Sequence, residues 1–572
     1  MGAAALDIEW TSYFKPPRYP ARLPALVDGR DPARHRVAIV GAGAVGMILA
    51  LGLARRGVAS VILDAEDSVC EGSRALCVSR RSLEILDGVD AAAPMLRDGL
   101  AWTGGRSYWR DKEVFQFEMP HDSGQRFPPM INLQQCFIEQ HLVDLCARRA
   151  DLIDLRWRSR VASIDSRADG VMVGVETPSG AYSLDCGWLA ACDGARSFVR
   201  QALGLRLEGT QYEGRYVIVD IALDSAYPTE RRAWFDPPSN PGSTLLMHKQ
   251  PRGIWRLDYQ LADGEDADEA VKPENIVPRV RSHLRMIGER DDWKMVWAGM
   301  YKANALTLAS YRHGRVLFAG DAGHLVPIFG VRGLNSGIED AHNLAWKLAA
   351  VTSEAATPAL LDTYSAERVH ATRENLRYAT KSTEFMAPPS PAFSLMREAV
   401  LSLAPDHHWI RPLINPRQTA AVPLPRSPLN APDDPAFTAG PAPGDVLVEC
   451  SVTIIDGAKR RDGYVTELCG PGFTALCFVD PDGPAADLRD ALTALDGGAL
   501  PVRARLIAPA AGVATVDAID PDGRVQAAYG ATAGTIYLLR PDGHVLGRWR
   551  RPDAAALAAA MARIGDGGET RR

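Results

Sequence analysis

The most regular hydrophobic pattern begins at residue 36, where an apolar run leads into a glycine-rich turn and then into a second apolar segment. Residues 36–40 predict a buried strand, residues 47–56 a helix and residues 58–63 a second strand. This order of elements is that of a βαβ unit, which indicates an α/β fold.

Further along, the pattern changes to one typical of antiparallel strands. Residues 205–300 are strand-rich, and residues 242–249 and 253–260 predict a hairpin around the turn at 250–252. Alternation places Leu245, Met247 and Lys249 on one face of the first strand. On the second strand, Trp255, Leu257 and Tyr259 share a face.

A proline-rich stretch, residues 412–443, precedes a last unit. In that unit, residues 472–479 predict a strand, residues 534–549 a hairpin with a Pro-Asp-Gly turn, and residues 553–564 an alanine-rich helix. We therefore expect a separate C-terminal unit beyond about residue 444.

Composition narrows the class of protein. The chain has 572 residues and a net charge of −6, which argues against general attraction to nucleic acid or to an anionic membrane. No apolar run approaches the roughly 20 residues that cross a bilayer. The nine cysteines have no C-x-x-C spacing and form no metal-ligand cluster with the histidines. These features indicate reduced thiols, a cytoplasmic protein and no metal site.

The turn at residues 41–46 carries the clearest chemistry, the pattern G-x-G-x-x-G. Gly41 permits the tight turn, Gly43 lets the backbone approach a pyrophosphate, and Gly46 allows close packing of helix and strand. Ala44 and Val45 open the helix, whose N-terminal N–H groups favour phosphate. Asp64, followed by Ala65, ends the second strand where an acid would bind ribose hydroxyls. This unit alone does not separate FAD from NAD, and an ordinary glycine turn is the alternative.

Later segments distinguish these cofactors. They are residues 71–75 and 80–86, the stretch from Leu189 to Arg200 with Asp193-Gly194, and residues 316–348 with Gly320-Asp321 and Gly333-Leu334-Asn335. Together with the glycine turn, they resemble the class A flavoprotein monooxygenases, the single-component FAD aromatic hydroxylases. Phenol hydroxylase, 3-(3-hydroxyphenyl)propionate hydroxylase and polyketide hydroxylases belong to that family.

The resemblance implies a fold and its domains. It implies a Rossmann-like FAD-binding domain (residues 36–204 and 301–410) interleaved with an antiparallel-sheet substrate domain (205–300), after an N-terminal arm (1–35). A linker (411–443) would lead to a thioredoxin-like C-terminal domain (444–572). The arm either lies on the body of the protein or is a flexible terminus. Since the last domain lacks C-x-x-C, we expect it to be structural or to support a homodimer.

The resemblance also implies the reaction. The enzyme would use NAD(P)H and O2 to hydroxylate a small phenolic or other electron-rich aromatic substrate through a flavin C4a-hydroperoxide, with noncovalent FAD. Deprotonation of a phenol requires a base or proton relay, for which the sequence names no residue. The alternatives are a related FAD epoxidase, halogenase or reductase, an NAD-dependent dehydrogenase, and an inert flavin-fold scaffold.

Several site residues are carried over from the family. Asp321 would bind the ribityl chain, Pro327 would lie beside the isoalloxazine, and the helix from Gly333, Leu334 and Asn335 would stabilise negative charge on the reduced flavin. The FAD contacts would be completed by Arg74, Gln135, Val161, Asp193, Gly194 and Gly320. A solvated arginine and an ordinary core valine are the alternatives for Arg74 and Val161.

Two expectations concern the substrate. Arg332 replaces the uncharged residue usual in the family, and its guanidinium would pair with an anionic substrate or the reduced flavin, or point to solvent. The family places its antiparallel sheet over the flavin's reacting edge, so one face of the hairpin should line an aromatic pocket. We expect Met247 and Trp255 there, ordinary core packing being the alternative.

Overall fold

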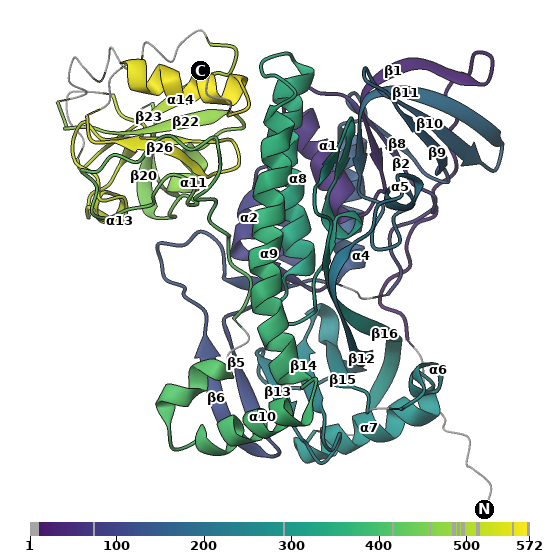
Figure 1. Ribbon diagram of the computed structural model, residues 1–572. Helices are drawn as coiled ribbons and strands as arrows, with labels where there is room; N and C mark the ends of the chain where they lie inside the picture. The colour runs from purple at the N-terminus through teal and green to yellow at the C-terminus, as the bar shows by residue number, and fades with distance from the viewer. Residues whose placement is uncertain are drawn as a thin grey trace, which may run out of the picture.

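The computed structural model describes residues 11–568 apart from 73–74, 263, 290–291, 415–416, 458, 483–487, 489–491, 493–497, 511–514 and 552–553. The long helices α8 (Gly333–Thr352) and α9 (Leu360–Met386) run side by side through the middle of the molecule (Figure 1). A mainly parallel sheet lies on one side of them and the C-terminal unit on the other. An antiparallel sheet lies at the lower end of the view.

The parallel sheet contains the predicted βαβ unit. β1 (Arg30–Val40), α1 (Ala44–Ala54) and β2 (Ser60–Leu63) follow one another, and β1 pairs in parallel with both β2 and β11. β1 starts at Arg30, inside the segment predicted as an arm. The sheet order is β17 (Arg312–His313), β18 (Val316–Phe318), β11 (Gly180–Ala191), β1, β2 and β8 (Ile153–Arg156), with β10 (Val171–Thr177) and β9 (Arg160–Ser166) added antiparallel beyond β11.

Helices cover this sheet and bury its strands. α8 packs between α1 and α9, and almost all of its residues are buried. Small residues permit this close approach, since a side chain added at Gly52 of α1 would lie 2.8 Å from the Ala345 Cβ of α8. The other elements of this half are α4 (Gln135–Arg148), α5 (Phe198–Ala202), α2 (Arg80–Asp87), α3 (Ala92–Asp98), and the small sheet of β3 (Cys77–Ser79), β7 (Met130–Asn132) and β4 (Leu100–Trp102).

The antiparallel sheet is wider than the predicted range 205–300. Its order is β19 (His324–Leu325), β16 (Trp293–Thr307), β12 (Glu208–Leu223), β15 (Ile254–Gln260), β14 (Thr244–Lys249), β13 (Arg231–Phe235), β5 (Gly104–Trp109) and β6 (Lys112–Glu118). The predicted hairpin is confirmed as β14 and β15, joined through η1 (Pro251–Gly253). The added strands β5 and β6 come from a distant part of the chain, and strand pairing between distant segments has no local sequence signal.

The two faces of this sheet have different neighbours. One face packs its apolar side chains, including Met247 and Trp255, against α7 (Pro273–Met286), which follows α6 (Ala267–Ala270). The opposite face carries Leu246 and turns toward Phe329 of the loop before α8. The hairpin therefore presents its other face to the half of the molecule that contains the parallel sheet.

The C-terminal unit forms a mixed sheet with short helices around it. Its strand order is β21 (Lys459–Tyr464), β20 (Ser451–Asp456), β24 (Ala518–Ile519), β23 (Val502–Ala508), β22 (Phe473–Phe478), β25 (Ile536–Leu539) and β26 (Val545–Trp549). The helices are α11 (Val465–Leu468), α13 (Arg524–Ala528) and α14 (Ala554–Gly565). The predicted strand, hairpin and alanine-rich helix are β22, β25–β26 and α14. The thioredoxin-like assignment stays a prediction.

A buried polar network docks this unit on the central helices. Arg540 donates to Glu367 of α9 at 2.8 Å from each of two nitrogens, and Lys347 of α8 donates to the same carboxylate at 2.6 Å. Asp542 accepts from Asn343 at 2.9 Å and from Trp346 at 2.8 Å. The charged groups of the network are paired, and Arg540 and Asp542 bind side chains of α8 and α9, so this network holds the unit on the two helices.

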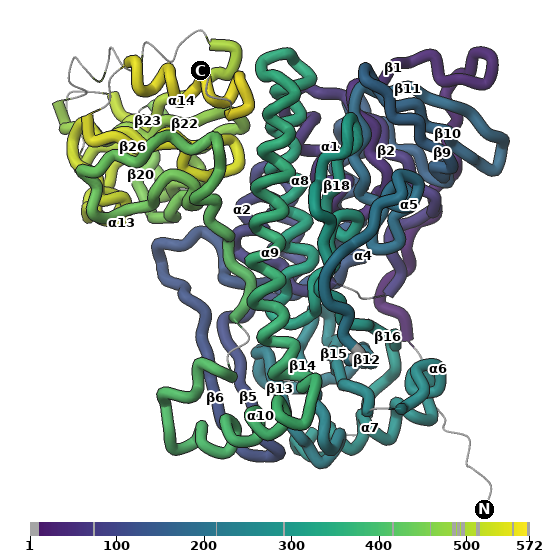
Figure 2. Tube along the Cα trace, in the orientation of Figure 1, coloured from purple at the N-terminus to yellow at the C-terminus, as the bar shows by residue number. Residues whose placement is uncertain are grey.

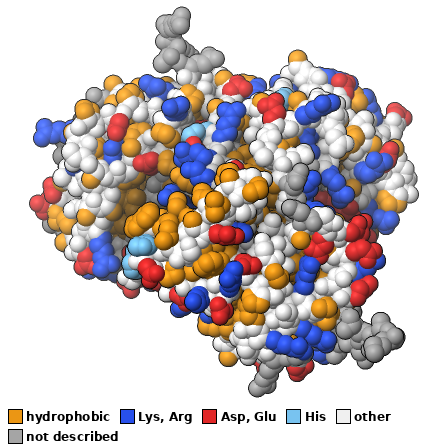
Figure 3. Space-filling model, turned by 60° about the horizontal axis from the view of Figure 1, so that its bottom comes forward, with side chains coloured by type: hydrophobic (Ala, Val, Ile, Leu, Met, Phe, Trp, Pro, Cys, Tyr) orange, Lys and Arg blue, Asp and Glu red, His pale blue; other side chains and the backbone are white. Residues whose placement is uncertain are grey.

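Peripheral segments complete the molecule. Figure 2 shows the chain after α10 (Pro391–Leu403) and η3 (His408–Leu413) running along α9 to the C-terminal unit. Figure 3 turns this end forward and shows hydrophobic side chains gathered on the surface; the exposed ones on α10 and η3 are Leu395, Met396, Leu403, Trp409 and Leu413. Along the N-terminal segment, Phe14 packs on Phe137, and Tyr19 stacks on Trp157 at 5.1 Å. No described helix is long and apolar enough to cross a membrane.

Candidate active site

The glycine turn meets the end of a neighbouring strand. Gly41 has φ +104°, and a Cβ there would lie 2.5 Å from the carbonyl oxygen of Cys192. A Cβ at Gly46 would collide with the carbonyl oxygen of Gly41. At Gly43 an added Cβ would meet, among the described residues, only Glu139 Oε1 at 3.8 Å, so this position leaves the backbone open to a ligand. α1 has no side-chain cap, and its first N–H groups at Ala44 and Val45 belong to a helix N-terminus that favours phosphate.

Asp64 lies at the end of β2 and is bound to the glycine turn. Its Oδ2 accepts a hydrogen bond from the Ala42 N–H at 2.5 Å, and its Oδ1 accepts one from the Glu66 N–H at 2.8 Å. Burial raises the pKa of this carboxyl group. The carboxylate thus braces the glycine turn from within, with both oxygens engaged by backbone, while Ala65 beside it is exposed.

Gln135 and Glu139 fix the loop that follows β2. Gln135 Oε1 accepts from the Ala75 N–H at 3.0 Å, and its Nε2 donates to Glu139 Oε1 at 2.8 Å. Glu139 Oε2 accepts from the Cys70 N–H at 2.8 Å. Gln135 therefore lies next to the loop that contains Arg74, which itself falls outside the described residues. Val161 is buried in β9 opposite Val175.

The Asp193-Gly194 pair lies at the end of β11, in contact with the glycine turn. Asp193 Oδ2 accepts from the Val199 N–H at 3.0 Å, and its Oδ1 is buried without a hydrogen-bond partner among the described residues. Burial raises the pKa of Asp193. Gly194 has φ +75°, which lets the chain turn away here. This motif and the glycine turn, separated by about 150 residues in sequence, form one surface.

Gly320-Asp321 lies in η2 (Gly320–Ala322), beside α1 and α8. The Gly320 N–H donates to Asp340 Oδ2 at 3.0 Å, and a Cβ on Gly320 would lie 3.0 Å from Val45 Cγ2. The Asp321 side chain is exposed, and Pro327 is buried a few residues later. Asp321 is thus carried on a segment that is anchored to both helices.

The anchor of that segment was not predicted. Asp340 of α8 also accepts from His324 Nε2 at 2.7 Å and from Arg368 Nε at 2.7 Å, and its neighbours lower its pKa to about 2 in spite of burial. His324, Asp340 and Arg368 are almost fully buried. His324 and Asp340 fall within the segment 316–348, but no local pattern pairs them with Arg368.

The N-terminus of α8 is held from the side by Asn335. Its Oδ1 accepts from the Ser79 N–H at 2.9 Å and from the Ser82 hydroxyl at 2.7 Å, and its Nδ2 donates to the carbonyls of Cys77 and Val331. The Asn335 side chain is saturated, so at this position only the backbone is available to a ligand. The first N–H groups of a helix have no intrahelical partner and attract negative charge.

Arg332 is a structural clamp in this structure. Its guanidinium donates to the Phe329 carbonyl at 3.1 Å and to the Arg417 carbonyl at 2.5 Å, and it is 3 % exposed. Burial lowers its pKa to about 10. No described carboxylate lies within ion-pair distance of it. The solvent-exposed alternative is therefore wrong, and the side chain ties the loop before α8 to the segment after η3.

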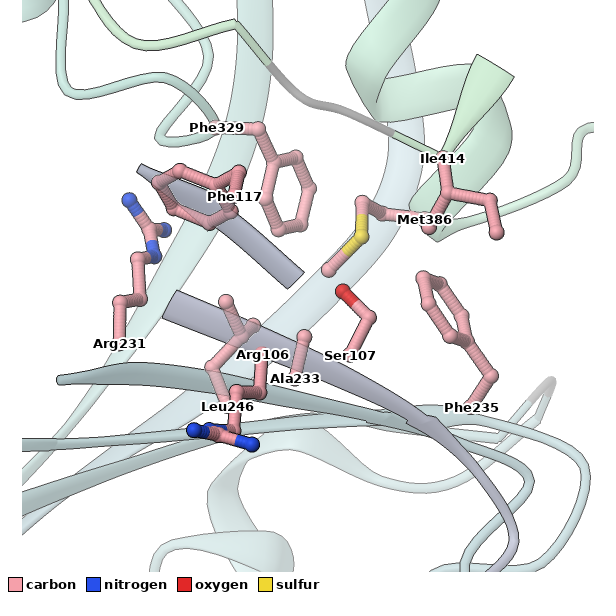
Figure 4. Close-up of a pocket in the computed structure, with 10 residues that line it drawn as sticks. All are labelled: Arg106, Ser107, Phe117, Arg231, Ala233, Phe235, Leu246, Phe329, Met386 and Ile414. Atoms are coloured by element: carbon pink, nitrogen blue, oxygen red, sulfur yellow. The ribbon is translucent and has the colours of Figure 1, made fainter. Parts of the chain in front are cut away.

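A small cavity lies between the antiparallel sheet and the loop before α8 (Figure 4). It is lined mainly by aromatic and aliphatic side chains, with two arginines: Phe117, Phe235, Phe329, Leu246, Met386, Ile414, Ala233, Ser107, Arg106 and Arg231. Arg106 is paired with Glu113 at 2.8 Å and Glu230 at 3.1 Å. Arg231 is 7 % exposed and contacts the neutral Gln418 Oε1 at 3.3 Å. It is therefore a buried cation at the wall of an apolar cavity, and no sequence pattern pointed to it.

Met247 and Trp255 are not at this cavity, which corrects the expectation from the sequence. Both belong to the core between the sheet and α7. Alternation identified which residues share a face, but the choice of face depended on α7, and the cavity is lined by Leu246 of the opposite face.

The site combines a helix N-terminus that favours phosphate, two further turns that pair glycine with aspartate, and an apolar cavity. A protein-family model described as "FAD binding domain" matches residues 34–379. The chain belongs to this FAD-binding family. FAD is its cofactor, and the predicted FAD-dependent monooxygenase is confirmed; the predicted α/β fold with an antiparallel sheet is confirmed as well.

Curated relatives of this flavoprotein cover nearly the whole chain. A "3-(3-hydroxy-phenyl)propionate/3-hydroxycinnamic acid hydroxylase" of Mycolicibacterium smegmatis is 27 % identical over 556 residues, covering 94 % of this chain and 95 % of its own. A protein of the same name from Mycobacterium sp. strain JLS is 28 % identical over 558 residues, covering 94 % of each chain. The likeness therefore includes the C-terminal unit.

Solved flavin enzymes share the fold. The flavin-dependent monooxygenase PieE, solved with FAD and substrate, has a TM-score of 0.75 at 24 % identity and covers 93 % of this chain and 99 % of its own. Aklavinone-11 hydroxylase, solved with FAD and aklavinone, has a TM-score of 0.73 at 24 % identity and covers 94 % of this chain and 99 % of its own. The arrangement of FAD-binding half, antiparallel sheet and C-terminal unit is thus common to these proteins.

Proposed function

We propose that this flavoprotein uses NAD(P)H and O2 to hydroxylate a small phenolic substrate that carries a negatively charged group. The observation that carries the proposal is the cavity beside the FAD-binding half, where aromatic side chains surround a space and Arg231 supplies a buried positive charge. Aromatic walls suit an aromatic ring, and a desolvated guanidinium favours a carboxylate or phenolate. The curated relatives are named for hydroxyphenylpropionate, which has a carboxylate.

The residues present fit FAD. Gly43 leaves the backbone open, the N-termini of α1 and α8 offer free N–H groups, and Asp321 lies exposed beside both helices. In our proposal Gly41, Gly43 and Gly46 accommodate the pyrophosphate, Asp321 binds the ribityl chain, and the α8 N-terminus stabilises negative charge on the flavin. Bound FAD would supply the redox chemistry and the activation of dioxygen.

The remaining assignments concern the edge of the FAD site. We propose that Gln135, Val161, Asp193, Gly194, Pro327 and the segment with Arg74 contact the cofactor. Asp64 then acts on FAD indirectly, because its two oxygens hold the glycine turn.

We also propose that the enzyme is a cytoplasmic homodimer; light scattering that gives the mass of one chain at micromolar concentration would refute the dimer.

The substrate is tested with two matched compounds, 3-(3-hydroxyphenyl)propionate and its neutral methyl ester. We expect the acid to accelerate NAD(P)H oxidation and to give a product heavier by one oxygen atom, as measured by mass spectrometry. Arg231→Gln should raise the dissociation constant of the acid by about ten- to a hundredfold, the loss of one charge-assisted contact, and leave that of the ester nearly unchanged. Equal effects on acid and ester would refute the role of Arg231, and absence of any oxygenated product across a panel of phenols would refute the function.

A further inference from the structure

The cavity-facing side of the antiparallel sheet continues into a buried polar cluster. We call the set of Asp220, Arg231, His248, Arg256 and Asp258 the sheet cluster. All five side chains are less than 10 % exposed, although polar and charged groups are seldom buried without partners. The cluster lies on the face opposite Met247 and Trp255.

Strand register places this cluster against the cavity wall. Leu246, which lines the cavity, lies directly opposite Asp258 in the β14–β15 pair and opposite Ala233 in the β13–β14 pair. Residues directly opposite in antiparallel strands have Cβ atoms about 5 Å apart on the same face. Arg231 belongs to both the cavity and the cluster. Asp258 is therefore one side chain away from the cavity.

One acid in the cluster is satisfied and the other is not. Asp220 Oδ1 accepts from Arg256 Nε at 3.0 Å and from Gln250 Nε2 at 2.7 Å. Asp258 Oδ1 is buried and has no hydrogen-bond partner among the described residues, and the same holds for His248 Nε2. His248 Nε2 lies 3.9 Å from Asp258 Oδ2. Two titratable groups thus lie next to each other near the cavity wall, and each has one buried polar atom without a hydrogen-bond partner among the described residues.

The charges around Asp258 favour titration near neutral pH. Burial raises its pKa to about 6, with Asp220 adding to the rise and Arg256 and Arg231 opposing it. Burial and the same two arginines hold the pKa of His248 well below its usual value, so the imidazole is neutral.

Groups from other elements also face the cluster. Cys77 of β3 is a neutral thiol, because burial raises its pKa to about 11, and the phenol of Tyr13 in the N-terminal segment lies near Arg256. Among the described groups facing the cluster, Asp258 is the one that changes charge close to pH 6.

We propose that Asp258 accepts the proton of the substrate's aromatic hydroxyl, directly or through one water, and that His248 positions its carboxylate. The inference rests on the proposed function, which requires a phenol to be activated. The substrate's O–H bond breaks, its electron pair stays on the phenolate oxygen, and a new O–H bond forms on Asp258. Asp258 returns the proton when the product becomes neutral. The phenolate ring is more electron-rich and therefore reacts more readily with an electrophilic oxygen.

The first test measures protons and needs no turnover. At pH 8 free 4-nitrophenol is mainly phenolate, and Asp258 is ionised in the free enzyme. When the phenolate binds beside this carboxylate, Asp258 should take up about one proton, because two adjacent anions cannot both stay ionised. Calorimetry of oxidised holoenzyme in buffers of different ionisation enthalpy measures that number. Asp258→Asn should take up none, whereas Asp258→Glu and the exposed control Asp268→Asn should behave as wild type.

The second test measures the pH profile of hydroxylation. Wild-type turnover should fall below about pH 6, where Asp258 is protonated. The turnover rate of Asp258→Asn should be about 10²- to 10⁴-fold lower than that of wild type at pH 7. It should rise as the pH approaches the pKa of the free phenol, because the substrate then ionises unaided. His248→Gln should keep the proton uptake but move the acidic limb of the profile, which a purely structural role would not do. The flavin spectrum and thermal midpoint of each variant identify misfolded protein.

The outcomes separate the two proposals. Equal proton uptake by wild type and Asp258→Asn, or turnover of Asp258→Asn within threefold of wild type at pH 7, would overturn the assignment of Asp258. Proton uptake that depends on Asp258, without an oxygenated product from any phenol, would support the assignment and refute the proposed function instead.

Discussion

The docking of the C-terminal unit on the central helices yields the sharpest stability prediction. Asp542 accepts hydrogen bonds from Arg540 at 2.6 Å, Trp346 at 2.8 Å and Asn343 at 2.9 Å, all in a fully buried setting. Its pKa lies well below the usual value because Arg540 and His544 favour the ionised form over the effect of burial. Asp542→Ala would leave a buried guanidinium short of its partner and two N–H groups unpaired.

The expected cost follows from these losses. Removing one partner of a buried ion pair lowers the free energy of unfolding by about 3–5 kcal/mol, and each buried donor left without an acceptor lowers it by about 1–3 kcal/mol. The terms overlap within one network, and Glu367 still binds Arg540, so we expect a total of about 4 kcal/mol. Since 1.4 kcal/mol is a factor of ten, the population with the C-terminal unit detached or unfolded should rise about a thousandfold.

Urea unfolding monitored by tryptophan fluorescence, together with limited proteolysis of the native protein, measures this effect. Asp522→Ala is the matched control, because Asp522 is an exposed acid of the same unit, 3.6 Å from Arg524, and a surface pair contributes at most about 1 kcal/mol. The free energy of unfolding of Asp542→Asn, which retains an acceptor oxygen, should lie between those of Asp542→Ala and Asp522→Ala. If Asp542→Ala is within 1 kcal/mol of Asp522→Ala, the network does not hold the unit in place.

Four other outcomes are expected. Asp321→Ala should raise the FAD dissociation constant about ten- to a hundredfold through loss of a charged hydrogen-bond partner, and an unchanged constant in fluorescence titration would remove Asp321 from the site. Arg332→Gln should lower the unfolding free energy by about 1–3 kcal/mol but leave substrate affinity within about threefold, because the guanidinium is bound to two carbonyls; a tenfold weaker affinity would mean that it reaches the substrate. The pKa of Asp340 is about 2 in the fold against 3.8 ordinarily, so this group contributes about 2 kcal/mol of stability above pH 4 that is lost as pH falls toward 2; Asp340→Asn should flatten that limb of the unfolding curve. Trichloroacetic acid should release the flavin to the supernatant, and colour retained in the pellet would show a covalent bond.

Local patterns determined the framework of the fold. The apolar run of β1, the glycine turn and β2 are consecutive elements whose type follows from local hydrophobic pattern and glycine spacing, and the structure places them as expected, although β11, the other partner of β1, comes from a distant segment. The same holds for the hairpin β14–β15 and for the Gly320-Asp321 segment before α8. In these segments glycine at fixed positions and a regular hydrophobic period are themselves the physical constraint, so the sequence suffices.

Only the tertiary structure decided which face of the sheet meets the cavity and which polar groups become paired. Alternation grouped Met247 with Leu245, but α7 covers that face, and Leu246 lines the cavity instead. For Arg332, only the fold shows that its guanidinium donates to the carbonyls of Phe329 and Arg417. Conversely, Arg231 and Asp258 have no local signature, because the burial of a charged side chain depends on what folds over it. Burial and pairing depend on contacts between segments that are distant in sequence. For that reason the cavity and the polar cluster beside it could be found only in the tertiary structure.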